Sequence, residues 1–428
     1  MLSPGVVRLV VARRHLCCVL ASGALFLTCL LRYWVTYDPN DSVSRLQEMP
    51  GIALNLSEKG QFANPFFLLN TGPSAHVAPA FAVFMALVIK LFGERAAGAY
   101  AIKLAAVLIV AFQVAIFPEV SSRLGMGWIN GFIAACFWIV AKPLLVFNWE
   151  AFYAALLIIV TCCVYRRYLD QEPPGESRTA WLLGFLFGLL ILTIPTFVPV
   201  VFAWLAWEIW RSRSAFLRKS LLPLAVLPAI IISPWVIRNY LVFHSLMIRD
   251  SAGIELAVSN NDCAQFSLRR TMDSGCAREM NPEGSVSEAR KVLVMGEAQY
   301  NEMRLQQALH WIESHPVRFF RLTGMRFIAF WFPTENGTIH YAGKGRRLER
   351  VMIYLMTLLG IYGLVALYRS DIKSAALCIS CLTLYPPAYY MCLFVGRYRY
   401  PILWMTFLLG ALPITRYAVR KLVRQPID

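Results

Sequence analysis

Residues 50–93 begin with PGIALNLSEKGQFANPF and end with TGPSAHVAPAFAVFMALVIKLFG, and this stretch is the most informative part of the chain about its fold. It follows the first long apolar segment, carries few charges, and is rich in proline, glycine and asparagine. Connections between helices are usually only a few residues long, so a segment of this length and composition is expected to have a structure and a task of its own. The sequence therefore predicts a functional loop beside a membrane.

The composition indicates a polytopic membrane protein. Of 428 residues, 58% are hydrophobic and only 15% are charged, and the mean hydropathy is +0.55, so most of the chain cannot be buried inside a water-soluble globule. The 41 Lys and Arg against 25 Asp and Glu give a net charge of +16. In a membrane protein such an excess reflects basic cytoplasmic loops and anionic headgroups. We expect no nucleic-acid partner, because no basic soluble domain exists to bind one.

Apolar runs of about 18 or more residues predict about ten transmembrane helices, since about 20 residues at 1.5 Å rise cross the hydrocarbon core. We expect an all-α fold, with the first span retained as a signal anchor because no convincing small-x-small cleavage pattern follows it. The predicted spans are 15–35, 97–117, 128–147, 149–165, 180–195, 197–210, 220–237, 350–368, 373–392 and 400–416.

The segment Val77–Phe92 is apolar but short, is opened by Pro79 and is interrupted by Lys90. If it does not cross the membrane, the short basic loops and both basic termini all lie on one side, as the positive-inside rule requires. We therefore predict an interfacial helix at 77–92, with both termini cytoplasmic. The basic residues on that side are Arg8, Arg13, Arg14, Arg123, Arg166, Arg167, Arg178, Arg211, Arg213, Arg218, Lys219, Arg369, Lys373, Arg416, Arg420, Lys421 and Arg424.

This topology divides the chain into three parts. Residues 1–237 form an N-terminal membrane module that contains the first outer loop (35–96), residues 238–349 form an outer-face loop domain, and residues 350–428 form the C-terminal membrane helices. Because everything facing the cytoplasm is short, binding and catalytic residues are expected on the outer side. The predicted location is a bacterial inner membrane with the active site on the periplasmic face.

Acidic residues gather where the first span ends. Asp38, Asp41 and Glu48 are the densest set of carboxylates near the outer surface. A carboxylate held against apolar walls at the bilayer boundary can act as a general base or ligate a divalent metal, which leaves the metal requirement open. We interpret Asp38 and Asp41 as solvated loop acids. Glu48 directly precedes an apolar turn, so a helix starting there would direct it toward a site.

Arginines at outer helix ends supply the complementary charge. Arg238 lies in PWVIRNY, and Arg397 and Arg399 lie in GRYRYP. A guanidinium at this depth is costly unless it is paired, and a lipid-linked phosphate is a natural bidentate partner. Snorkelling of each arginine to lipid headgroups is the alternative.

Other polar residues in the outer segments have two possible roles. His76 is a candidate to bind a sugar hydroxyl or a phosphate, or a structural loop histidine, and Asn260 and Asn261 are candidates for hydroxyl recognition or part of a plain turn. Cys263 and Cys276 are the only cysteines in the outer loops, and they form either a disulfide or two free thiols. The other cysteines lack the spacing of a metal site.

Several common catalytic signatures are absent from the sequence: GxxxxGK[ST], HExxH and GxSxG. An ATP-driven pump, a zinc-dependent protease of that type and a serine hydrolase therefore have little support. The free energy for any group transfer is expected to come from the substrate.

The loop motifs resemble those of bacterial GT-C glycosyltransferases, which are relatives of the protein O-mannosyltransferases and of the lipid A aminoarabinose transferases. The matching pieces occur in the family's order and cover the first loop, the long loop and the final spans. They are EMPGIA (48–53), GQFANPF (60–66), TGPSAHVAP (71–79), KLFG (90–93), PWVIRNYLVFHSLMIRDSAGIEL (234–256), GEAQY (296–300), ESHPVRFFRLT (313–323) and GRYRYP (396–401).

The resemblance implies an enzyme that transfers a sugar, with inversion, from a polyprenyl-phosphate donor to a lipid, glycan or protein acceptor on the outer face. By position, Glu48 inherits the role of base or metal partner, and Arg238, Arg397 and Arg399 that of binding the carrier phosphate. Glutamate replaces the more usual Asp, and Pro50-Gly51 and Ala80-Phe81 depart from the family pattern. The exact base and the need for a metal therefore stay open. A transporter or flippase of lipid-linked sugars, or a polymerase or ligase of surface glycans, remains the alternative function.

Overall fold

The computed structural model describes residues 4–34, 48–143, 147–171, 177–211, 219–334 and 347–424. Within these ranges the chain is helical, without strands, and has only two isolated β-bridges, Ala63 with Pro73 and Ser267 with Phe394. The principal helices are α1 (Pro4–Trp34), α2 (Glu48–Lys59), α3 (Pro79–Phe92), α4 (Ala96–Ala115), α5 (Phe117–Arg123), α6 (Trp128–Ala141), α7 (Ala151–Leu169), α8 (Ser177–Thr193), α9 (Val198–Arg211), α11 (Leu227–Phe243), α12 (Ala252–Ser259), α13 (Leu268–Asp273), α14 (Cys276–Met280), α15 (Val286–Met295), α16 (Glu297–Ser314), α17 (Pro316–Trp331), α18 (Arg347–Ser370), α19 (Ile372–Leu384), α20 (Pro387–Met391) and α21 (Tyr400–Arg424), with short turns η1 (Pro195–Phe197), η3 (Leu222–Val226) and η6 (Gly396–Tyr398).

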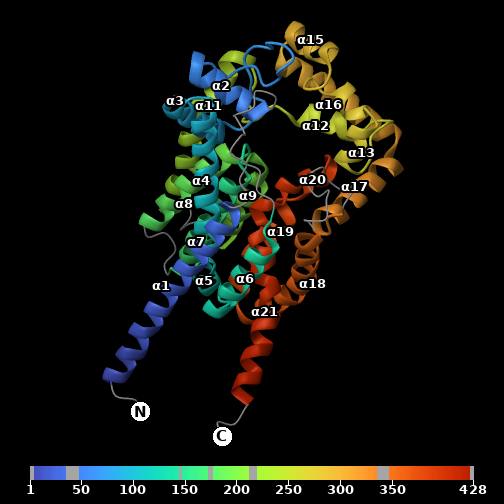
Figure 1. Ribbon diagram of the computed structural model, residues 1–428. Helices are drawn as coiled ribbons and strands as arrows, with labels where there is room; N and C mark the ends of the chain where they lie inside the picture. Colours follow the sequence, from blue (N-terminus) through green and yellow to red (C-terminus); the bar gives the residue numbers. More distant parts are fainter. Residues whose placement is uncertain are drawn as a thin grey trace.

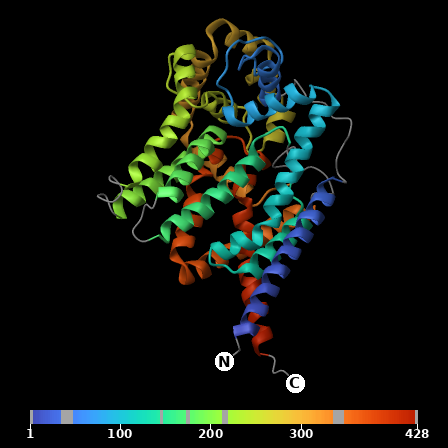
Figure 2. The same ribbon diagram turned by 90° about the vertical axis from the view of Figure 1, so that its left-hand side faces the viewer.

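The helices form a bundle with a cap at one end. Figure 1 shows α1, α4, α7, α18 and α21 in the bundle, while α2, α12, α15 and α16 lie at the end opposite the two chain termini. Figure 2 shows the same division from the side. The cap contains α2, α12, α15 and α16 from the segments predicted to lie on the outer side, and that location stays a prediction.

Each of the ten predicted spans overlaps helical structure, and the predicted span 373–392 is divided between α19 and α20. Five helical segments are long and apolar enough to cross a membrane: Ala96–Ala115, Ala151–Leu169, Leu222–Phe243, Arg347–Ser370 and Tyr400–Lys421. Some of the other helices are shorter than the predicted spans because the backbone conformation or a proline ends them. Lys142 adopts a left-handed backbone conformation before Pro143 and ends α6 at Ala141, and the Pro386-Pro387 pair separates α19 from α20. The protein is an integral membrane protein, and the number of spans stays a prediction.

Helix α3 occupies the place of the predicted interfacial helix. Pro79 lies in its first turn, and Gly93, with φ of 83°, ends it. One side packs against α2, α4 and α8, while Val83, Leu87 and Leu91 on the other side are exposed. In Figure 2 α3 runs across the end of α4. An exposed apolar side on a helix of this length agrees with a position in the lipid interface, which remains a prediction.

The two outer segments pack together into one unit. Phe66 of the first segment is buried among side chains of the second, including Ile254, Val292 and Tyr300. Backbone bonds reinforce this contact, since Asp250 N–H donates to the Ala75 carbonyl at 2.7 Å. Burial of a phenylalanine contributes roughly 1.5–3 kcal/mol. The first segment is therefore fixed in place by the second.

Candidate functional site

Glu48 is positioned by the start of α2, since it is held at the head of that helix. It is the first residue of that helix, and Met49, Ile52 and Ala53 behind it are buried. A carboxylate in the first turn also interacts favourably with the positive end of the helix dipole. Glu48 is itself buried, so its charge must be balanced by protein groups or by a substrate.

A tight reversal after α2 brings His76 back to Glu48. Asn64 has φ of 57°, a left-handed conformation that asparagine tolerates, and its side chain accepts a hydrogen bond from Gly72 N–H at 2.8 Å. Gly72 has φ of 88°, where a glycine is strongly favoured. Further along, Ser74 N–H donates to the Phe62 carbonyl at 3.0 Å, and the chain then reaches His76.

Glu48 and His76 form a buried ion pair with 3.0 Å between Oε1 and Nε2. Burial alone would raise the pKa of Glu48, but the charge and hydrogen bond of His76 outweigh it and lower that pKa. Burial likewise opposes protonation of His76, yet Glu48 raises the pKa of the imidazole to about 9. At neutral pH the pair is therefore a carboxylate held by an imidazolium.

Two arginines add positive charge around this pair. Arg249 precedes α12, and its Nε donates to the His76 carbonyl at 2.9 Å. Arg397, in η6, lies 3.6 Å from the ring centroid of Trp149 and is half-buried. Both arginines lower the pKa of Glu48. The structure thus brings Arg397 and His76 to Glu48 and adds Arg249, which the sequence analysis did not single out.

Two further glutamates face the same group of charges. Glu255 in α12 has its pKa raised by burial and by the charge of Glu48. Glu283, between α14 and α15, has its pKa raised to about 8, first by burial and then by Glu48. Glu283 is therefore mostly protonated at neutral pH. We call Glu48, His76, Arg249, Glu255, Glu283 and Arg397 the charge cluster.

Glu297 supports the loop that carries His76. It is the first residue of α16, and its Oε1 accepts the Ala75 N–H at 2.6 Å. Burial raises the pKa of Glu297 to about 7. Asp250, whose pKa is raised to about 6 by burial, lies nearby and repels it. These acids hold the backbone beside His76 in place.

Replacing Glu297 with glutamine is expected to stabilise the protein relative to wild type more at pH 8 than at pH 5. The folded-state pKa of Glu297 is about 7 against an ordinary value of 4.5, so its favourable contribution is present below about pH 4.5 and is lost as pH rises through 7. Glutamine keeps an acceptor for Ala75 N–H and cannot ionise. Melting temperatures of the purified protein at both pH values measure this, with exposed Glu302→Gln on the same helix as control. A difference that does not change with pH would contradict it.

The three arginines that were predicted to bind the carrier phosphate have different surroundings. Arg397 lies in the charge cluster, whereas Arg238 donates to the carbonyls of Ser74 at 2.7 Å and Phe62 at 3.0 Å. Arg399 is buried and donates to the Phe330 carbonyl at 2.6 Å. The bonds of Arg238 position the first outer segment, and that of Arg399 joins the start of α21 to α17.

Asn260 and Asn261 have side chains occupied by the protein. The Asn260 amide donates to the Leu256 and Met391 carbonyls, each at 2.9 Å, and its oxygen accepts from Arg326 at 3.1 Å. Asn261 bonds Ala257 and Val258 in the preceding turn. Asn260 ends α12 and joins it to α17 and α20, whereas the Asn261 amide bonds back to α12. Within the described residues neither side chain is bonded to the charge cluster.

The cysteines of the outer segment are bonded to each other. Cys263 and Cys276 are joined in a disulfide, the first of the two alternatives, with 5.9 Å between their Cα atoms. It closes the loop before α14. Asp38 and Asp41 lie outside the described residues.

The charge cluster does not fit a divalent metal. In the part of the chain that the structure describes, no group of three or more His, Cys, Asp or Glu is arranged to hold one. The nearest partner of Glu48 is the His76 imidazole at 3.0 Å, whose pKa Glu48 raises to about 9, and an imidazole must lose its proton before it can ligate a metal. Arg249 and Arg397 place further positive charge beside Glu48. These groups do not favour binding of a divalent cation.

Sequence reasoning missed Arg249, Glu255, Glu283 and Glu297. The first two lie in MIRDSAGIEL, where three charged residues interrupt an otherwise apolar stretch, and Glu297 lies in GEAQY. Charges in such stretches were the available signal, since charged residues are rarely buried without a partner. Glu283 lies in an ordinary polar turn and gave no such signal.

No protein-family model and no curated protein matches this sequence. Solved structures do match. The apo crystal structure of the Archaeoglobus fulgidus oligosaccharyltransferase aligns with a TM-score of 0.56 at 11% identity, covering 95% of this chain and 53% of that one. A structure of the archaeal oligosaccharyltransferase AglB from the same organism, in complex with an inhibitory peptide and a dolichol-phosphate, aligns with a TM-score of 0.50 at 14% identity, covering 95% and 52%.

A third structure, the A. fulgidus oligosaccharyltransferase in complex with Zn and sulfate, aligns with a TM-score of 0.50 at 11% identity, covering 94% of this chain and 50% of that chain. This chain therefore spans about half the length of the structures that it matches. At such identities the likeness concerns the fold alone, which this chain shares with these oligosaccharyltransferases.

Proposed function

We propose that this protein is an integral-membrane glycosyltransferase that moves a sugar from a polyprenyl-phosphate donor to an acceptor on the outer face. The observation that carries the proposal is the buried Glu48–His76 pair, flanked by Arg249 and Arg397, on a GT-C fold. A structure in the comparison contains a dolichol-phosphate and a peptide, which supports a lipid-linked donor for this chain. The proposed acceptor is a lipid, a glycan or a protein.

The reaction that fits these groups is a single in-line displacement. An acceptor O–H or N–H attacks the anomeric carbon, the bond from that carbon to the phosphate oxygen breaks, and the acceptor proton passes to the Glu48 carboxylate. The electron pair of the broken bond stays on the polyprenyl phosphate. The sugar is attached with inversion.

The cationic residues have two tasks in this scheme. Arg249 and Arg397 neutralise the charge that grows on the departing phosphate, a contribution that is large in a site shielded from water. His76 holds the Glu48 carboxylate in one position through the 3.0 Å contact. Glu283, protonated at neutral pH because its pKa is about 8, can donate a hydrogen bond to a phosphate oxygen.

Purified protein with a synthetic polyprenyl-phosphate sugar tests the proposal. We expect polyprenyl phosphate to be released and the sugar to become attached to an acceptor lipid, glycan or protein. Mass spectrometry detects both products. Movement of the intact donor between leaflets of a vesicle, with no release of polyprenyl phosphate, would instead identify a transporter. Protein treated with a metal chelator is expected to remain active, because the charge cluster does not fit a metal.

A further inference from the structure

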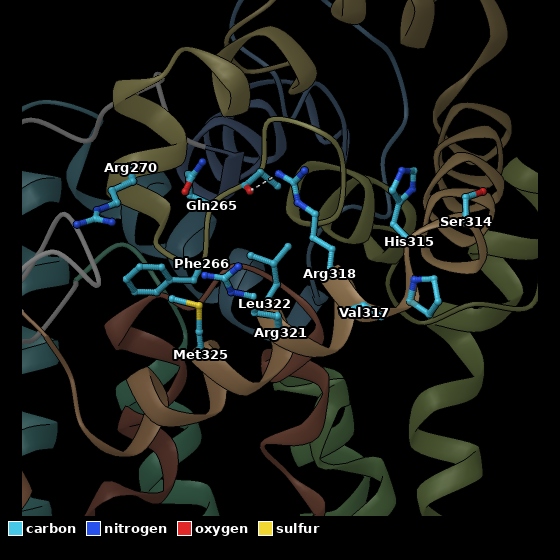
Figure 3. A pocket seen from close by; sticks show the side chains of 12 residues that line it. Gln265, Phe266, Arg270, Ser314, His315, Val317, Arg318, Arg321, Leu322 and Met325 are labelled. Atoms are coloured by element: carbon cyan, nitrogen blue, oxygen red, sulfur yellow. Dashed lines mark hydrogen bonds between the residues drawn. The ribbon is translucent and has the colours of Figure 1, made fainter.

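A second polar site lies away from the charge cluster, where α16 meets α17. It is a cavity of about 690 Å³ bordered by the segment Ala264–Phe266, the start of α17 and Arg270 of α13. No residue of the charge cluster lines it. In Figure 3 Arg318 and Arg321 extend from α17 toward Gln265 and Phe266.

The charges that line this cavity are positive. Arg270, Arg318 and Arg321 contribute guanidinium groups, and none of the lining residues is acidic. Arg318 donates to the Asp262 carbonyl at 2.7 Å, and Arg270 lies 5.5 Å from the Phe266 ring centroid. Within the described residues no carboxylate forms a salt bridge with any of the three. Three guanidinium groups without counter-ions favour a ligand that carries negative charge.

The start of α17 adds to this preference. Residues 314–318 line the cavity, so the first turn of this 16-residue helix faces it. Its N-cap residue, His315, makes no side-chain capping bond to the helix. Free N–H groups and the dipole at a helix start attract anions, and phosphate is a frequent ligand there. Arginines and helix start therefore point to the same chemistry, a phosphate group.

Apolar groups beside the cavity indicate that the phosphate belongs to a lipid. Leu322 and Met325 line the cavity, and on the outside of α17 Phe320, Phe327 and Ile328 are 71%, 49% and 57% exposed. An exposed apolar stripe on a basic helix is typical of a helix in the membrane interface.

The contact between α17 and a candidate membrane span also agrees with a lipid ligand. Its end lies beside the candidate span α18, where Thr357 donates to the Trp331 carbonyl at 3.4 Å, ten residues after α18 begins at Arg347. Arg321 precedes Trp331 by about 15 Å of helix. The end of α17 thus contacts the candidate span ten residues from its first residue, and the basic start of α17 lies about 15 Å back along the helix.

We propose that the cavity between α16, α17 and the segment Ala264–Phe266 binds the phosphate headgroup of an anionic lipid of the outer leaflet. Arg318, Arg321 and the start of α17 hold the phosphate, Arg270 adds charge at the rim, and the acyl chains follow Leu322 and Met325 toward the bilayer. This site does not depend on the proposed transfer reaction.

Native mass spectrometry of the full-length protein in detergent tests the proposal, with titrations of phosphatidylglycerol and of zwitterionic phosphatidylcholine. Wild type is expected to retain phosphatidylglycerol preferentially, and Arg321→Gln to bind it roughly fivefold more weakly, since one interfacial arginine contributes about 1 kcal/mol. Arg321 makes no hydrogen bond or salt bridge with described residues, so this variant is expected to fold. Arg318→Gln with Arg321→Gln is expected to lose more.

The matched control is Arg278→Gln with Arg290→Gln, which removes two exposed charges from α14 and α15 of the same outer segment. Equal lipid affinity of the control and the Arg318/Arg321 variant would overturn the proposal. Displacement of the lipid by millimolar inorganic phosphate, with no preference for phosphatidylglycerol, would also overturn it by assigning the cavity to a free anion.

Discussion

Glu48→Gln is expected to reduce the rate of sugar transfer by roughly 10²–10⁴-fold, the usual contribution of a general base. Glutamine has nearly the same shape but cannot accept the acceptor's proton. The substitution also removes the charge that raises the pKa of His76 to about 9. Because Arg249 and Arg397 are retained, donor binding is expected to change little.

Single-turnover kinetics and equilibrium binding of a non-reactive donor analogue separate these two effects. Glu58→Gln is the matched control, since Glu58 is exposed on the same helix, α2. Wild-type turnover in Glu48→Gln would remove Glu48 from the catalytic role. Equal loss of binding and turnover would instead indicate that Glu48 only shapes the site.

Arg397→Gln is expected to lower the rate of transfer by about 10²–10³-fold, the range found when one preorganised donor to a developing negative charge is removed. Arg397 is braced against Trp149, 3.6 Å from the ring centroid, so its guanidinium is held before the phosphate arrives. Arg397→Lys keeps the charge but loses the planar fork, and we expect it to recover only part of the rate.

The measurement is the rate of sugar transfer by the Arg397 variants with donors that differ in their leaving group. A donor whose phosphate departs more readily is expected to restore more activity in Arg397→Gln than in Glu48→Gln, because the two residues act on opposite ends of the displacement. Arg278→Gln, which removes an exposed charge from the same outer face, serves as control. Identical responses of both variants to the leaving group would refute the division of roles.

The fold was largely predictable because its signals are local. Apolar runs of sufficient length predict helices, and all ten predicted spans overlap helical structure. The helix predicted at 77–92 corresponds to α3, with Pro79 at the head of its apolar stretch. Helix ends were less predictable, because the left-handed Lys142 is not evident from composition.

The site was less predictable because the partners of its charges are distant in the sequence. Arg238 and Arg249 lie eleven residues apart in one motif, yet the first binds carbonyls of the turn before His76 and the second adds its charge to Glu48. Asn260 appeared free for a ligand, but Arg326, 66 residues later, binds it. Which polar groups are already satisfied depends on tertiary contacts, and an individual sequence does not contain those explicitly.

The bond from Ala75 N–H to Glu297 joins residues 222 positions apart, which has a consequence for biogenesis. At about 5–20 residues per second, a ribosome needs roughly 10–45 seconds to reach Glu297 after Ala75 has been made. During that interval Phe66 lacks the side chains of Ile254, Val292 and Tyr300, which enclose it in the finished fold. A newly made molecule therefore passes through a stage in which the early loop exposes an aromatic side chain, and the second segment must be synthesised before that side chain can be buried.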